Sequence, residues 1–144
     1  MKHVLTFVTV LALLFTGGIP SAHAKQEPPI PYAMQDWFLR QKIQEHLNDK
    51  LMEIIAACES TGSPKRIKHW NEDGSLVANP DSSARGALQT LVYLHRKRIA
   101  ELGLDMNNID DYMRFVKDLK KRQGYGAWNP SRHCWGDYRH LAGQ

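Results

Sequence analysis

The chain has 144 residues and a formal net charge of +4 at pH 7, from 19 basic and 15 acidic side chains. That length suits a single domain with one hydrophobic core. A mild basic excess is compatible with an anionic polymer as partner, but the dense lysine and arginine runs of nucleic-acid-binding proteins are missing. The composition therefore argues against a nucleic-acid binder.

The first 24 residues have the pattern of a secretory signal peptide. Lys2 precedes the apolar run VLTFVTVLALLF, and the segment ends in Ala22-His23-Ala24, an Ala-x-Ala cleavage site. The run is too short to span a bilayer, and no later segment approaches spanning length. We expect cleavage near Ala24, which leaves 120 residues (144 − 24) with a net charge of +3, because Lys2 is lost. An uncleaved anchor is the alternative. The pattern predicts a periplasmic or secreted protein without stable membrane insertion.

Residues 25–33, KQEPPIPYA, contain three prolines and predict an extended lead-in, so we expect the folded domain over residues 34–144. Apolar residues at helical spacing from Met34 to Cys58 predict one or two helices, with a break near Asn48 and an end at Gly62. The polar segment 65–83 carries Asp73-Gly74 between two short strand-like segments, 67–70 and 75–78. This arrangement favours a tight β-hairpin.

Two further helices are predicted from apolar periodicity and terminal glycines. One runs from about residue 84 to 102 with Gly103 past its end, and the other from about 108 to 123 with Gly124 as its stop. The aromatic segment after Gly124 reads as mostly loop. The sequence thus predicts a single, mainly helical domain with a small β-hairpin.

The mature chain would hold two cysteines, Cys58 and Cys134. In a compartment that oxidises thiols we expect them to pair, and two buried free thiols are the alternative. A loop of this length would stabilise the fold by roughly 4 to 5 kcal/mol in the chain-entropy model.

Glu59 ends the first apolar helical pattern. At 100° per residue it lies above Ile55, at the edge of the apolar stripe that includes Cys58. Partial burial there would raise the pKa of its carboxyl, which suits a general acid that works near neutral pH. On these grounds alone, a solvated glutamate at a helix end explains the position equally well.

Four strings, taken in order, resemble motifs of the soluble lytic transglycosylases within the lysozyme-like superfamily. ACESTG at 57–62 resembles the catalytic E-S-x-G motif, and SARGALQ at 83–89 is similar to the S-x-x-G-x-x-Q segment. NNI at 107–109, followed by a helix into Gly124 and Trp128, resembles the N-I-x-x-G and Y-x-x-G…W end. The final CW at 134–135 resembles the ending of the disulfide-bearing branch.

The resemblance covers roughly residues 51–136, and the chain departs from it in two places. Thr90 follows Gln89 where the family usually has an apolar residue, which affects packing near the expected cleft. The segment between Gly62 and Ser83 is longer than in compact members, so the substrate-facing loop is less well defined by the resemblance.

The resemblance implies a lysozyme-like fold in which a sugar cleft runs between the hairpin side and the helical side. Glu59 would be the catalytic residue, which protonates the glycosidic oxygen between N-acetylmuramic acid and N-acetylglucosamine in peptidoglycan. The expected substrate-binding residues are Ser60, Ser83, Gly86, Gln89, Tyr93, Tyr125 and Trp128. For Ser60, a helix-end hydroxyl bonded to the backbone is the alternative, and for Gln89 a solvated helical side chain.

Aromatic faces stack on pyranose rings, so Tyr93, Tyr112, Tyr125 and Trp128 are candidates to line the sugar cleft. Trp70 in the polar hairpin is also suggestive, whereas core packing explains Tyr112 and Trp135 better. His69, His95 and His133 do not have the spacing of metal ligands with any second ligand. We therefore expect neither a metal nor another cofactor, and we expect a monomer.

Three interpretations of function remain open from the sequence. In the first, a lytic transglycosylase, Glu59 acts as acid and then as base and leaves an anhydromuramyl end. In the second, a lysozyme, Asp73 or Asp81 is the second carboxylate, although Asp73 could cap its own turn and Asp81 the helix expected from residue 84. The third is a non-catalytic protein that docks a secretion or conjugation complex on peptidoglycan.

Overall fold

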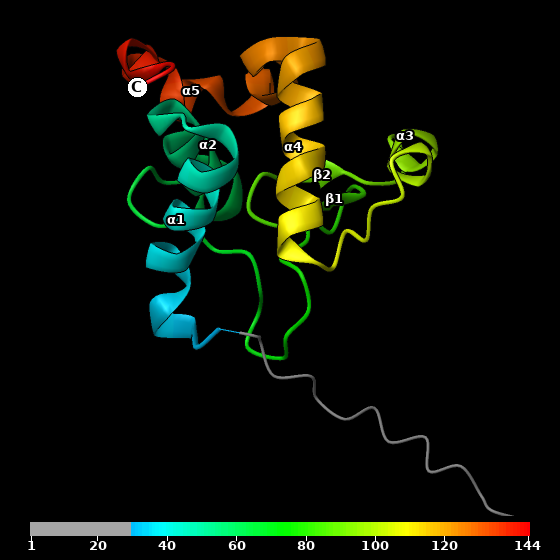
Figure 1. Cartoon of the computed structure of the whole chain (residues 1–144). Helices are drawn as coiled ribbons and strands as arrows, with labels where there is room; N and C mark the ends of the chain where they lie inside the picture. The colour runs from blue at the N-terminus through cyan, green and yellow to red at the C-terminus, as the bar shows by residue number, and fades with distance from the viewer. Residues whose placement is uncertain (1–29) are drawn as a thin grey trace, which may run out of the picture.

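The computed structural model describes residues 30–144 (Figure 1). The expected signal peptide and most of the expected lead-in fall on residues 1–29, outside the described residues. The described part is mainly helical, with a small two-stranded antiparallel sheet, as predicted. Within residues 30–144 no helix has the length and apolar character needed to cross a membrane.

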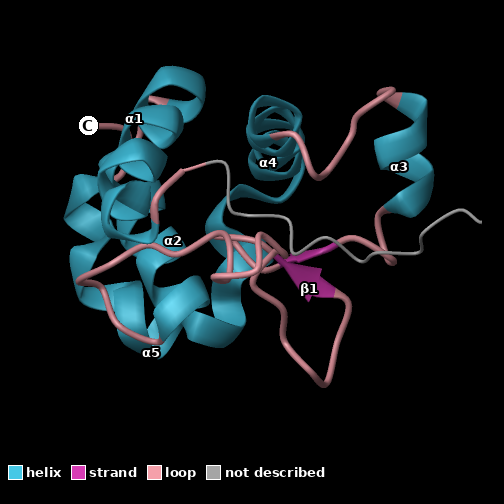
Figure 2. Ribbon diagram, turned by 90° about the horizontal axis from the view of Figure 1, so that it is seen from below, coloured by secondary structure: helices cyan, strands magenta, loops and turns pink. Residues whose placement is uncertain are grey.

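The elements follow one another along the chain with short connections, except for the long segment between the second helix and the sheet. They are a 3-10 turn (Tyr32–Met34), α1 (Gln35–Leu47), α2 (Lys50–Thr61), β1 (Ala84–Arg85), β2 (Thr90–Leu91), α3 (Arg96–Glu101), α4 (Ile109–Gln123), a 3-10 segment (Gly124–Ser131), α5 (Arg132–Trp135) and a last 3-10 segment (Gly136–Leu141). In Figures 1 and 2, α1, α2 and α5 form one side of the molecule, α4 lies centrally, and α3 projects at the opposite edge.

The predicted break at Asn48 is confirmed and has a local cause. Asn48 ends α1 in the left-handed conformation with φ 46°, and Asp49 begins α2 by accepting a hydrogen bond from the Leu51 N–H at 3.0 Å. At the other end, Gly62 takes φ 71° and its N–H donates to the Cys58 carbonyl at 2.9 Å. These caps fix where α2 starts and stops, and so they fix the place of Glu59 in its last turn.

The predicted helix over 108–123 is confirmed as α4. The Asn108 side chain accepts hydrogen bonds from the N–H groups of Asp110 and Asp111, and Gly124 follows the last helical residue. Basic residues in the last turn complement the helix dipole. The buried face of α4, which includes Tyr112 and Phe115, packs into the hydrophobic core and faces α1.

The predicted helix over 84–102 is wrong. Residues 84–85 and 90–91 pair as antiparallel strands, with Ala84 opposite Leu91 and Arg85 opposite Thr90, and only Arg96–Glu101 is helical. Gly86 and Gln89 have φ of +74° and +44°, which a right-handed helix cannot contain. Tertiary contacts with Tyr112, described below, hold this turn in place and override the helical pattern of the leucines.

The predicted hairpin over 67–78 forms only in part, without regular strands. Its two arms meet in a single bridge between Trp70 and Leu76, and a second bridge joins Ala78 to Arg85. The two-stranded sheet of the described residues therefore lies downstream of the predicted hairpin, at residues 84–91.

The expected disulfide between Cys58 and Cys134 is confirmed. The S–S distance is 2.05 Å and the two Cα atoms are 5.9 Å apart. The bridge joins the last turn of α2 to α5, so it ties the C-terminal segment to the helix end that carries Glu59.

Candidate functional site

Glu59 lies half-buried in the last turn of α2, next to the disulfide. Burial raises the pKa of its carboxyl, and the single hydrogen bond that it accepts from Ser131 lowers the pKa only in part. The C-terminal end of α2 acts in the same direction as burial, because the partial negative charge of the last carbonyls disfavours another anion. The protonated form of Glu59 is therefore favoured at a higher pH than in a solvated glutamate.

Ser131 is the hydrogen-bond partner of this carboxyl, and the sequence analysis missed it. Its Oγ donates to Oε1 of Glu59 at 2.5 Å, while Nε1 of Trp135 donates to Ser131 Oγ at 3.0 Å. The indole N–H also reaches the Trp128 carbonyl at 3.1 Å, so the ring is held in place. The Ser131 hydroxyl has a second acceptor in reach, the Trp128 carbonyl at 3.2 Å, but the shorter distance favours donation to Glu59.

The turn at residues 86–89 is organised by Tyr112 of α4. The Tyr112 hydroxyl donates to the Arg85 carbonyl at 3.1 Å and accepts from the Leu88 N–H at 2.9 Å and from Thr90 Oγ1 at 3.2 Å. Burial raises the pKa of Tyr112 to about 12, and the negative charge of Glu59 contributes in the same direction, so the phenol stays protonated. The hydroxyl of Thr90, which departs from the family pattern, is thus satisfied by Tyr112 inside the core.

His69 supports the same turn from the other side. Its Nδ1 accepts a hydrogen bond from the Ala87 N–H at 2.9 Å, and burial lowers its pKa to about 3, so the ring is neutral. A Cβ on Gly86 would lie 2.6 Å from Cε1 of His69, which explains why a glycine with positive φ is needed there. Within the described residues His69 Nε2 has no hydrogen-bond partner, and the ring packs edge-on against Trp70 and Tyr112.

Trp128 connects this turn to Ser131. It is only 3% exposed, and its Nε1 donates to the Leu88 carbonyl at 3.0 Å. Its own carbonyl accepts from Trp135. A continuous set of hydrogen bonds therefore runs from the 86–89 turn through Trp128 and Trp135 to Ser131 and Glu59. Trp70 is also buried, at 3% exposure. Neither indole offers a face at the surface, so their contacts are those of core residues.

Two other predicted site residues near the motifs bond the backbone. Ser60 Oγ donates to the Ala56 carbonyl at 2.7 Å and accepts from the Lys68 N–H at 3.0 Å, as in the alternative considered for it. Gln89 is not helical, and its Nε2 donates to the Gly86 carbonyl at 2.9 Å and the Val77 carbonyl at 3.4 Å. Ser60 therefore ties the end of α2 to the segment at Lys68, and Gln89 holds the 86–89 turn against Val77.

The remaining predicted residues lie in different surroundings. The Ser83 carbonyl accepts from the Val92 N–H beside the sheet, and Tyr93 is 68% exposed, with the Arg96 guanidinium 4.3 Å from its ring centroid. The Tyr125 hydroxyl donates to Oδ2 of Asp49 at 2.6 Å. Asp49 caps the N-terminal end of α2, about 15 Å along the axis from Glu59 (ten residues at 1.5 Å), so Tyr125 braces the opposite end of the helix.

The two aspartates proposed as second carboxylates lie in surface turns. Asp73 Oδ1 accepts from the Ser75 N–H at 3.0 Å and from its hydroxyl at 2.5 Å, which is the turn-capping role expected for it. Asp81 is exposed, and the helix that it was expected to cap does not exist. Ser82 Oγ accepts from the Ala84 N–H at 3.1 Å at the start of β1 instead.

One group of side chains has the composition of a metal site: Glu45, His46 and Asp110. Lys42 lies among them, with Nζ 2.7 Å from Asp110 Oδ1 and 3.1 Å from Glu45 Oε2. The lysine supplies the positive charge, so we assign this group as an ion-pair cluster that joins α1 to α4.

Comparison of the chain with protein-family models, with curated proteins and with solved structures finds no match. Any function must therefore be inferred from the residues around Glu59 and their geometry.

Proposed function

We propose that the protein is a peptidoglycan lytic transglycosylase in which Glu59 is the catalytic acid and base. The observation that carries the proposal is a half-buried carboxyl with a raised pKa whose partner is a hydroxyl. Within residues 30–144 no cation lies within ion-pair distance of Glu59, so no fixed charge opposes its protonation. Such a group keeps its proton to a higher pH than a solvated glutamate, and it can both give up a proton and take one back.

The proposed reaction uses the same carboxyl twice. Glu59 first donates its proton to the glycosidic oxygen, and the bond between that oxygen and C1 of N-acetylmuramic acid breaks. The carboxylate then accepts the proton of the C6 hydroxyl of the same sugar as its oxygen bonds to C1. The products are a free hydroxyl on one fragment and a 1,6-anhydro ring on the other, and no water is consumed.

The surroundings of the two aspartates support this reaction over hydrolysis. A hydrolase ordinarily needs a second carboxylate across the bond, either as nucleophile or to activate water. Asp73 accepts two hydrogen bonds from Ser75 within its own turn, and Asp81 is exposed in a separate turn. Asp73 is thus engaged within its own turn and Asp81 lies at the surface, whereas a transglycosylase requires only the one carboxyl of Glu59.

Digestion of purified peptidoglycan, followed by mass spectrometry of the released fragments, tests the proposal. We expect fragments that are lighter by one water than hydrolysed ones and whose ends resist borohydride reduction. Predominantly hydrated, reducible ends would instead indicate a lysozyme. Sedimentation of intact protein with peptidoglycan, without release of fragments, would indicate a docking protein of a secretion or conjugation complex.

A further inference from the structure

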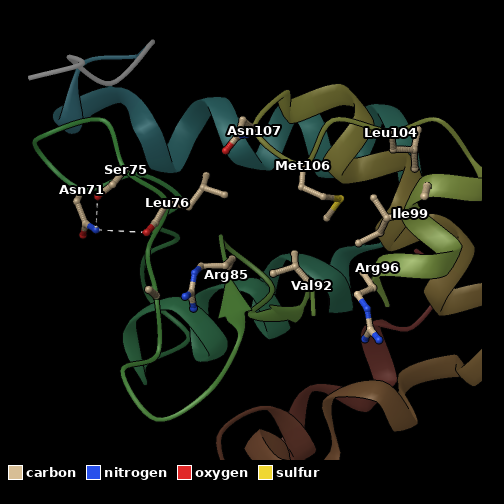
Figure 3. A pocket seen from close by; sticks show the side chains of 12 residues that line it. Asn71, Ser75, Leu76, Arg85, Val92, Arg96, Ile99, Leu104, Met106 and Asn107 are labelled. Carbon is tan, nitrogen blue, oxygen red and sulfur yellow. Dashed lines mark hydrogen bonds between the residues drawn. The ribbon is translucent and has the colours of Figure 1, made fainter. Parts of the chain in front are cut away.

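An open groove of about 770 Å³ lies between α3, the sheet and the segments around residues 71–78 and 104–107. Glu59 does not line it. Its floor is apolar and comes from Leu76, Val92, Ile99, Leu104 and Met106, whose side chains point toward one another in Figure 3. The groove thus exposes an apolar surface that the described chain leaves uncovered, at the edge of the molecule where α3 projects (Figures 1 and 2).

Two arginines, Arg85 and Arg96, lie along one rim of the groove (Figure 3). Each is held by the backbone: Arg85 Nη1 donates to the Ala84 carbonyl at 2.7 Å and the Ser82 carbonyl at 3.1 Å, and Arg96 Nη1 donates to the Tyr93 carbonyl at 3.0 Å. These bonds orient each guanidinium through Nη1. Among residues 30–144 nothing else hydrogen-bonds the Nε–H or Nη2 donors of these two arginines, so both donors can make a bidentate contact with a carboxylate.

The charge of these arginines is not balanced at the groove. None of its lining residues is acidic, and within residues 30–144 neither Arg85 nor Arg96 forms an ion pair. By contrast, Arg98, which lies on α3 like Arg96, pairs with Asp118 at 2.8 Å. Among the described residues, Arg85 and Arg96 are thus the arginines that line this apolar groove without an acidic partner, so their charge is open to an external anion there.

We infer that this groove docks an amphipathic helix of a partner protein that carries acidic residues on one flank. The apolar face of such a helix would cover the floor, and its carboxylates would meet Arg85 and Arg96. Two separate guanidinium groups fit a ligand with more than one carboxylate. A fatty acid has a single carboxylate and could therefore meet one arginine at most. A hollowed surface fits a convex helix better than a flat bilayer. This interaction goes beyond the proposed function, because it requires no contact with Glu59.

A designed peptide of about 18 residues, or five helical turns, is a suitable probe. It carries leucine at every third and fourth position and glutamate along one flank, and its twin carries lysine in place of glutamate. Fluorescence anisotropy with the full mature chain should show binding of the acidic peptide at least about tenfold tighter than that of the lysine twin. Arg96→Glu should reverse this preference, whereas Arg139→Glu, an exposed arginine in another segment, should leave it unchanged.

Chemical-shift mapping on the unaltered protein keeps the test independent of variant folding. The acidic peptide should perturb the methyl signals of Ile99, Leu104 and Met106. Equal affinity for the two peptides, perturbation confined to other residues, or binding to anionic vesicles without binding to the peptide would each overturn the inference. Tighter binding of a muramyl peptide than of the acidic helix would overturn it as well.

Discussion

Two glutamates of the same helix, Glu53 buried and Glu59 half-buried, have opposite surroundings. Glu53 and Glu59 lie six residues apart on α2, about 9 Å along its axis. The carboxylate of Glu53, only 4% exposed, accepts hydrogen bonds from Arg40 at 3.1 Å, Lys50 at 3.1 Å and Gln44 at 2.5 Å. Glu59 accepts one from the Ser131 hydroxyl. The carboxylate of Glu53 is thus compensated by two cations, whereas the half-buried carboxyl of Glu59 has no cationic partner among residues 30–144.

The N-terminal end of α2 repeats the first arrangement. Burial alone would raise the pKa of Asp49, but hydrogen bonds from Lys120 and Tyr125 outweigh it and lower the pKa. Asp49 and Glu53 each have cationic partners, so the charge of each carboxylate is compensated within the fold. Burial by itself therefore does not distinguish Glu59 from the other carboxyls of this helix, whereas burial without a cationic partner among the described residues does, and the proposed function rests on that difference.

The largest expected effect comes from replacing the uncompensated carboxyl. Glu59→Gln should lower the release of peptidoglycan fragments by about 10² to 10⁴-fold, because one group supplies both proton transfers. The pKa of Glu59 is raised in the folded protein, so ionisation of Glu59 lowers the free energy of unfolding. This loss is absent at a pH below the ordinary pKa of a glutamate, and it is complete once the pH has risen through the raised pKa of the folded state. The melting temperature of Glu59→Gln should consequently equal or exceed that of the wild type at pH 7, and the difference should vanish near pH 4.

Fragment release by turbidity clearance and thermal melts by circular dichroism measure the two quantities on the same samples. A correctly folded Glu59→Gln protein with more than about a tenth of wild-type activity would remove Glu59 from the mechanism.

The disulfide should have the second-largest effect, because it joins the uncompensated end of α2 to the segment that carries Ser131. In the chain-entropy model, a bridge with a sequence separation of 76 contributes about 4 kcal/mol. The double substitution Cys58→Ser and Cys134→Ser should lower the melting temperature accordingly. It should also lower activity at temperatures where the variant is still folded, since Ser131 is then less firmly held against Glu59. Urea unfolding of the variant, with reduced wild type as the matched control, provides the free energy.

Glu53→Gln makes the complementary test at the compensated carboxylate. Removing the charge of Glu53 should cost roughly 1 to 3 kcal/mol, because the buried carboxylate is lost while Arg40, partly exposed, keeps Asp36 as its other partner. Activity per folded molecule should change little, since Glu53 does not contact the candidate site. Loss of activity with unchanged stability in this variant would contradict the distinction between the two glutamates.

The sequence predicts well those parts of the fold that local chemistry determines. Asn48 and Gly62 end their helices in left-handed conformations, Asn108 caps α4, and Asp73 closes its own turn, each as its residue type favours. The disulfide follows from there being two cysteines in a chain with the pattern of secretion. The place of Glu59 at the end of α2 follows from the same caps.

The sequence fails where tertiary contacts outweigh local periodicity. Leu88, Leu91 and Val92 have helical spacing. The Tyr112 hydroxyl, 24 residues beyond Leu88, nevertheless bonds the backbone of the turn and holds it as a hairpin. Ser131 was missed because nothing in its own segment indicates a role. Ser131 precedes Cys134 by three residues, and Cys58 precedes Glu59 directly. The expected Cys58–Cys134 pair could therefore have predicted that Ser131 lies near Glu59.

The smallest expected effect concerns this serine. Its hydroxyl donates to the Glu59 carboxylate and so stabilises the charged form, and removal in Ser131→Ala should raise the pKa of Glu59 further. The proposed first step needs the protonated acid, so the alkaline limb of the pH–activity profile should move to higher pH. The loss of one hydrogen bond of about 1 kcal/mol should lower kcat about fivefold, because the carboxyl is less well oriented. Ser131→Thr, which keeps the hydroxyl, should restore both the limb and the rate, whereas Ser63→Ala, a serine just past α2, should change neither. If the alkaline limb of Ser131→Ala stays in place, the hydroxyl does not act on Glu59 during the reaction. The disulfide would then be the remaining link between the C-terminal segment and Glu59.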